Sequence, residues 1–179
     1  LYVLLVFMGW ISIYAAVYNE EHQSILDSTQ KYGKQLIWMG TSLILIIAIL
    51  FMDGRIFETF SFPIYITTII MLILVLLVGR EISGARSWFA IGSFTLQPSE
   101  FAKFSTALAL ARYLSATTTD FSTLKSKLIS FGIIGAPAIL IALQPDMGSV
   151  LVFGGLIFVL YREGLSGLLI FGGLWLALL

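Results

Sequence analysis

The 179-residue chain is 59% hydrophobic and only 11% charged, and its mean hydropathy is +0.99. Because soluble domains are far less apolar and more highly charged, the composition predicts an integral membrane protein. Ten basic residues balance ten acidic ones, so no net charge favours nucleic acid, and the absence of cysteine excludes disulfides and a thiolate nucleophile. A single histidine argues against a transition-metal site.

The chain begins and ends inside apolar runs, so we expect a segment of a longer protein, with one transmembrane domain over residues 1–179. Charge-free runs predict a first helix over residues 1–19, a second over 35–52 and a third over 59–79. At ~1.5 Å per residue, runs of this length approach or cross a hydrocarbon core ~30 Å thick. A polar loop over 19–34 separates the first two helices.

A charged stretch from Gly79 to Lys103 follows the third helix. Its residues 83–97 are too polar and too rich in Gly and Ser to cross lipid, so we expect a loop or a half-embedded segment there. Gln97-Pro98-Ser99-Glu100 is typical of a helix start, because proline fits the first turn and an acidic side chain complements the helix dipole. The fourth helix is predicted to end near Ser115.

A polar connector over 116–127 leads to a fifth helix, predicted over 128–143. Gln144-Pro145-Asp146-Met147-Gly148 repeats the proline-then-acid pattern and predicts a sixth helix that ends at Tyr161. A seventh, truncated helix is predicted over 167–179. The expected fold class is therefore all-α: a polytopic helical membrane bundle with about six complete transmembrane helices and one truncated helix.

The order of the helices predicts which segments share one side of the membrane. The chain crosses twice between Glu100 and Asp146, so both acidic helix starts face the same aqueous side, together with the loop over 19–34. Basic residues divide evenly between the two sides and do not decide the orientation. If Arg86 and Lys103 are treated as site residues, the balance places residues 116–127 in the cytoplasm.

Each charged candidate also has a simpler interpretation. Glu100 and Lys103 are three residues apart, so they could form only an exposed pair worth ~0.2–0.5 kcal/mol. Asp146 could serve only as a favourable charge at a helix N-terminus. Charges kept beside a membrane favour a functional site as the alternative, because burial of an ionised group in lipid costs at least ~2.5–3.5 kcal/mol.

Three motifs in this order resemble those of the SEDS family, whose members include the RodA elongation and FtsW division proteins. They are Gly84-Ala85-Arg86-Ser87-Trp88, then Gln97-Pro98-Ser99-Glu100 with Lys103, then Gln144-Pro145-Asp146-Met147-Gly148. The resemblance covers nearly the whole chain, and the Gln-Pro-Ser-Glu form with short loops is closer to RodA. Met147 replaces the usual Leu, which conserves volume.

The resemblance implies a peptidoglycan glycosyltransferase of about ten transmembrane helices. Such enzymes polymerise lipid II at the outer face of the cytoplasmic membrane, in cell elongation or division, together with a class B penicillin-binding protein. The family's catalytic acidic residue lies in a large loop after helix seven, so no catalytic residue is expected within these 179 residues.

Under this resemblance, the expected substrate-binding residues are Arg86, Glu100, Lys103 and Asp146. Arg86 and Lys103 would neutralise the departing diphosphate, Glu100 would orient Lys103 or the sugar, and Asp146 would cap a helix and shape the cavity. A divalent cation could bridge the diphosphate to a carboxylate, but the sequence specifies none. Two alternatives stay open: a flippase for the same lipid-linked precursor, and a non-catalytic membrane scaffold for cell-wall enzymes.

Overall fold

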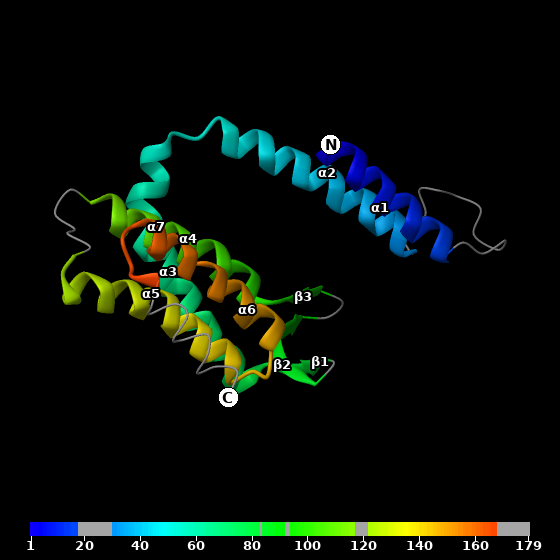
Figure 1. Ribbon diagram of the computed structural model, residues 1–179. Helices are drawn as coiled ribbons and strands as arrows, with labels where there is room; N and C mark the ends of the chain where they lie inside the picture. The colour runs from blue at the N-terminus through cyan, green and yellow to red at the C-terminus, as the bar shows by residue number, and fades with distance from the viewer. Residues whose placement is uncertain (18–29, 83, 92–93, 117–121, 168–179) are drawn as a thin grey trace. The chain divides into compact units, whose positions relative to one another are not determined.

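The computed structural model describes residues 1–17, 30–82, 84–91, 94–116 and 122–167 (Figure 1). The chain divides into two compact units, Leu1–Asp53 and Gly54–Leu179, and each is described by itself. The expectation of one transmembrane domain over residues 1–179 stays a prediction. Residues 168–179, where a seventh helix is predicted, lie outside the described residues, as does most of the loop over 19–34.

The first unit is a pair of apolar helices, α1 (Tyr2–Val17) and α2 (Lys31–Leu50), which lie side by side (Figure 1). Aromatic side chains join them near the start of α2. The indole nitrogen Nε1 of Trp10 donates to the backbone oxygen of Tyr32 at 3.1 Å, and the rings of Tyr14 and Tyr32 meet edge to face with centroids 5.1 Å apart. Trp10 therefore packs between the two helices, with its indole N–H satisfied by a backbone oxygen.

The second unit packs α3 (Gly54–Val78), α4 (Pro98–Ser115) and α5 (Leu124–Ala142) with two shorter helices, α6 (Met147–Gly155) and α7 (Ile157–Arg162). Its core is apolar, but a hydroxyl pair joins α3 to α4: Thr68 Oγ1 and Ser105 Oγ lie 2.7 Å apart, both buried. Tyr65 also donates its hydroxyl to the backbone oxygen of Ile133 on α5 at 2.9 Å. Such bonds between helices satisfy polar groups where lipid offers no water.

Between α3 and α4 the chain forms a small antiparallel sheet, which corrects the expected loop over 83–97. Its strands are β1 (Arg80–Ile82), β2 (Ala85–Ile91) and β3 (Phe94–Leu96), in the order β1-β2-β3. Gly84 has a φ of +84° in the tight turn between β1 and β2, a conformation that glycine adopts without a steric penalty. Pairing between the strands gives hydrogen-bond partners to backbone N–H and C=O groups that would be unpaired in an irregular loop.

The helices begin earlier than the charge-free runs predicted. Lys31, Arg55 and Lys125 all lie in the first turns of α2, α3 and α5, because a helix can continue past the point where its side chains leave hydrocarbon. These three helices are long and apolar enough to cross a membrane, and α1 and the α6–α7 segment are shorter apolar helices. The sixth predicted helix is divided at Leu156 into α6 and α7. The all-α membrane class is confirmed, with the sheet as an addition.

Candidate functional site

The predicted motifs meet at one end of the second unit, where α3 ends, α4 begins and α5 turns into α6 (Figure 1). A hydrogen bond joins two of the motifs directly: the side-chain Nε2 of Gln97 donates to Oδ2 of Asp146 at 2.9 Å. Gln97 directly precedes α4 and Asp146 directly precedes α6. The two helix starts therefore lie on the same side, which confirms the prediction from the number of crossings.

The opposite end of the unit supports the same arrangement. Arg112, in the last turn of α4, donates from Nη1 to Oε2 of Glu58 near the start of α3, at 3.4 Å. Because this pair joins the beginning of one helix to the end of the next, α3 and α4 run antiparallel. The Glu100 end and the Arg112 end of α4 consequently lie at opposite ends of the second unit.

Asp146 acts as the N-cap of α6. Its Oδ1 accepts a bond from the backbone nitrogen of Ser149 at 3.2 Å, while its Oδ2 accepts the bond from Gln97. A carboxylate in this position satisfies one of the free N–H groups of the first turn and complements the helix dipole. Its helix-capping role is thus visible, and a direct contact with substrate stays a prediction.

Glu100 and Lys103 form an ion pair on the first turns of α4, with 2.7 Å between Oε1 and Nζ. The Glu100 side chain is 59% exposed and the Lys103 side chain 25% exposed. Lys103 is therefore the more enclosed partner, and its charge has a carboxylate next to it. An ammonium group held this way keeps two of its three donors for another acceptor.

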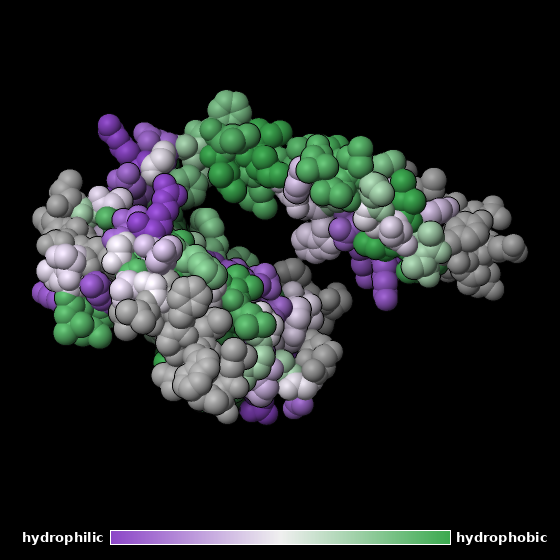
Figure 2. Space-filling model, viewed as in Figure 1, coloured by the Kyte–Doolittle hydropathy of each residue, from purple (hydrophilic) through white to green (hydrophobic). Residues whose placement is uncertain are grey.

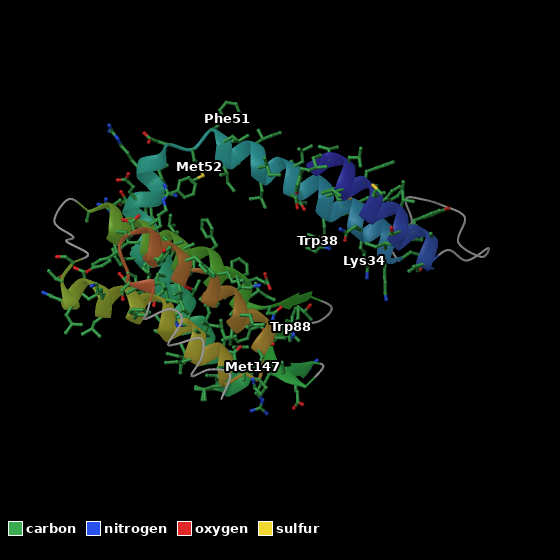
Figure 3. The ribbon with its side chains drawn as sticks, viewed as in Figure 1. Lys34, Trp38, Phe51, Met52, Trp88 and Met147 are labelled. Carbon is green, nitrogen blue, oxygen red and sulfur yellow. The ribbon has the colours of Figure 1, made fainter. Side chains whose placement is uncertain are left out.

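Arg86 is not brought into contact with that pair. It lies on β2, where the register of pairing with β1 shifts, and its neighbour Ser87 is buried while Arg86 is exposed. Within the described part of the chain, the side chain of Arg86 makes no hydrogen bond or ion pair. Trp88 follows two residues later on β2, and Figure 3 shows it on the sheet at this end of the bundle.

Two glutamines have roles that the sequence did not reveal. The motif alone assigns no role to Gln97, yet its bond to Asp146 joins the two helix starts. Gln144 is fully buried, and its Nε2 donates to the backbone oxygen of Leu72 on α3 at 3.3 Å. The signal for both was available, since a glutamine beside an apolar helix needs a partner for its amide.

Three polar atoms near these motifs are buried and have no hydrogen-bond partner among the described residues: Ser87 Oγ, Ser99 Oγ and Gln144 Oε1. Buried donors and acceptors are almost always paired with protein or ordered water.

The described residues contain no cluster of three or more His, Cys, Asp or Glu side chains that could hold a metal ion, so no residues are assigned to the divalent cation.

Comparison with known proteins supplies the family. The family model for FtsW, RodA and SpoVE, described as "Cell cycle protein", matches residues 1–179. Among curated relatives, "Peptidoglycan glycosyltransferase MrdB" of Escherichia coli K12 is 34% identical over 161 residues, covering 88% of this chain and 42% of that protein. "Probable peptidoglycan glycosyltransferase FtsW" of Mycobacterium tuberculosis is 32% identical, covering 84% of this chain and 29% of that protein.

Solved structures agree. The crystal structure of the rod shape determining protein RodA of Thermus thermophilus has a TM-score of 0.81 and 29% identity, over 97% of this chain and 55% of that one. A structure titled "Structural coordination of polymerization and crosslinking by a peptidoglycan synthase complex" also has a TM-score of 0.81 and 29% identity, over 99% of this chain and 50% of that one.

The chain thus spans less than half the length of these curated relatives. The family match and the apolar helices together make it a multi-pass protein of the cytoplasmic membrane. The motifs, their meeting at one end of the bundle and the match over residues 1–179 lead to one conclusion: the chain belongs to the FtsW/RodA/SpoVE family of cell cycle proteins.

Proposed function

We propose that this chain forms part of a peptidoglycan glycosyltransferase that polymerises lipid II at the outer face of the cytoplasmic membrane, in cell elongation and the maintenance of shape. The observation that supports the proposal is the bond between Gln97 and Asp146, which brings two acidic helix starts together at the end of the second unit that also carries Arg86. Relatives named peptidoglycan glycosyltransferases support the same reaction class.

The reaction transfers a sugar chain from a lipid diphosphate to a sugar hydroxyl. A base removes the proton of the attacking hydroxyl, and cations stabilise the negative charge that develops on the departing diphosphate. Lys103 is suited to this second task, because its ammonium group is partly enclosed and held in place by Glu100. Arg86 is the second candidate, since its exposed guanidinium can bind a phosphate through two parallel N–H···O bonds.

Glu100 and Asp146 then position other groups. Glu100 orients Lys103 through the 2.7 Å ion pair, and Asp146 fixes the start of α6 against Gln97. None of the described residues is assigned as the catalytic base, which the family resemblance places in the loop after helix seven.

The partner in this proposal is a class B penicillin-binding protein that cross-links the new strands. A solved structure that matches 99% of this chain concerns the coordination of polymerization and crosslinking by a peptidoglycan synthase complex. The substrate is the undecaprenyl-diphosphate-linked disaccharide, lipid II.

The test uses the full-length protein purified with its partner and incubated with labelled lipid II. We expect glycan chains, separated by gel electrophoresis, from the native protein and none from Lys103→Gln. Headgroup translocation in proteoliposomes without any polymer would contradict the proposal and favour the flippase. Neither polymer nor translocation, with the partner still bound, would favour the scaffold.

A further inference from the structure

The first unit contains a groove that the proposed reaction does not use. It lies between α1 and α2, has a volume of about 540 Å³ and is lined mainly by apolar side chains. Its walls include Val3 and Phe7 from α1 and Met39, Leu43 and Ile46 from α2. A groove of this volume with nonpolar walls resembles the sites that bind hydrocarbon or other small apolar ligands.

The groove extends about as far as one leaflet of a membrane. From Gln35 to Ile46 α2 rises ~16 Å, at ~1.5 Å per residue, which is about half of a hydrocarbon core ~30 Å thick. The aromatic contacts of Trp10 and Tyr14 with Tyr32 hold the two helices together just beyond the Gln35 end. A single lipid chain from one leaflet therefore fits the length of the groove.

Positive charge lies at one end of it. Lys31 precedes Gln35 by four residues and Lys34 precedes Trp38 by four, so each lysine shares a helix face with a residue that lines the groove. Both lysines are exposed. Figure 3 shows Lys34 and Trp38 extending from the same side of α2, and Figure 2 shows hydrophobic surface over α1 and α2 with hydrophilic side chains toward the end where α2 begins.

We propose that the groove between α1 and α2 binds one anionic glycerophospholipid, with an acyl chain between Phe7 and Leu43 and its phosphate at Lys31 and Lys34. The charge at the groove's polar end is complementary to a lipid phosphate. Trp38 stands at the boundary, where an indole favours one apolar and one wet surface. None of the residues that line the groove is among those proposed for lipid II, so the inference does not depend on that assignment.

Two pairs of variants test the groove and the charge. Gly40 lines the groove, and a Cβ placed there meets no atom within 4 Å, so we expect Gly40→Leu to add its side chain to the groove and occupy part of it. Gly9 on α1 is equally open but does not line the groove, so Gly9→Leu is its matched control. For the charge, Lys31→Gln with Lys34→Gln is compared with Lys125→Gln with Lys127→Gln, two lysines in the first turn of α5.

The readout is native mass spectrometry of the full-length protein after exchange into phosphatidylglycerol or phosphatidylcholine. We expect one retained phosphatidylglycerol, reduced roughly 10- to 30-fold in affinity by the Lys31/Lys34 change, because each lysine near a charged headgroup contributes about one kcal/mol. Gly40→Leu should abolish retention, whereas Gly9→Leu and the Lys125/Lys127 change should leave it intact.

Several results would overturn the proposal. Equal retention in Gly40→Leu and Gly9→Leu would place the lipid elsewhere, and equal retention of the two phospholipids would show that the lysines only extend to the membrane surface. Displacement of phosphatidylglycerol by added lipid II would assign the groove to the substrate. Loss of a bound protein partner in Gly40→Leu, with no lipid retained by the native protein, would assign it to a protein helix.

Discussion

The side-chain amide of Gln97 donates to the carboxylate of Asp146 across 2.9 Å, and the two residues are 49 positions apart in the chain. Each directly precedes a helix, so one hydrogen bond aligns the starts of α4 and α6. The same carboxylate caps α6 through Ser149. Displacing either helix start would therefore disturb both motifs.

The energetic coupling of Gln97 and Asp146 can be measured by a double-mutant cycle. We expect Gln97→Ala and Asp146→Ala each to lower thermal stability, with a coupling of roughly 1–2 kcal/mol because the bond is to a charged acceptor. Asp146→Asn should be milder than Asp146→Ala, since Asn also caps helices well. Thermal unfolding in detergent provides the measurement, and additive effects would show that the two side chains do not depend on each other.

The ion pair of Glu100 and Lys103 should matter for activity and hardly for stability. An exposed pair three residues apart contributes about 0.2–0.5 kcal/mol. We therefore expect the Glu100→Gln, Lys103→Gln double variant to melt like the native protein and to make no glycan chains. The pair of Glu58 and Arg112 at the other end of the bundle is the matched control. Full polymerisation by the Glu100/Lys103 variant would eliminate these residues from the substrate site.

Arg86 should not be replaceable by lysine if it binds the diphosphate. Lysine keeps the charge but lacks the planar pair of donors. We expect Arg86→Lys to lower lipid II turnover at least ~10-fold, equivalent to about 1.4 kcal/mol. Arg80 lies on β1, paired with Trp88 of β2, and is also exposed, so Arg80→Lys provides a control from the same sheet. Small and equal losses at the two positions would make Arg86 a membrane-interface residue.

The orientation of the bundle can be tested by cysteine labelling, because the chain has no native cysteine. Thr95 on β3 and Ser166 after α7 are both exposed and lie at opposite ends of the second unit. We expect Thr95→Cys to react with an impermeant thiol reagent added outside spheroplasts, and Ser166→Cys to react only after permeabilisation. The reversed pattern would place the motif end in the cytoplasm and remove the basis for an extracellular reaction.

Gly79 is a position where the backbone admits no side chain. A Cβ there would collide with the backbone oxygen of Val75, at the point where α3 ends and β1 begins. We expect Gly79→Ala to lower the melting temperature, because backbone atoms must move to relieve the clash. Gly54→Ala, where a Cβ meets nothing within 4 Å, should leave it nearly unchanged. Equal melting of both variants would contradict the close approach.

The sequence by itself determined the class of protein and the order of its helices. Uncharged runs predicted α1, α2, α3 and α5, and the Gln-Pro-Ser-Glu pattern predicted the start of α4 at Pro98. The helix starts at Lys31 and Leu124 were not predicted, because the end of a charge-free run marks where side chains leave hydrocarbon, and the backbone helix can continue into water.

Tertiary structure decided the sheet and the contacts of the site. The strands are short, and β1 and β3 are stabilised by pairing with β2. The Gly- and Ser-rich composition of this stretch is equally typical of a loop, so it does not predict the pairing. The bond from Gln97 to Asp146 depends on the packing of α4, α5 and α6, which brings together residues from distant parts of the chain. Local sequence specifies a helix start, but only packing selects which other helix start it meets.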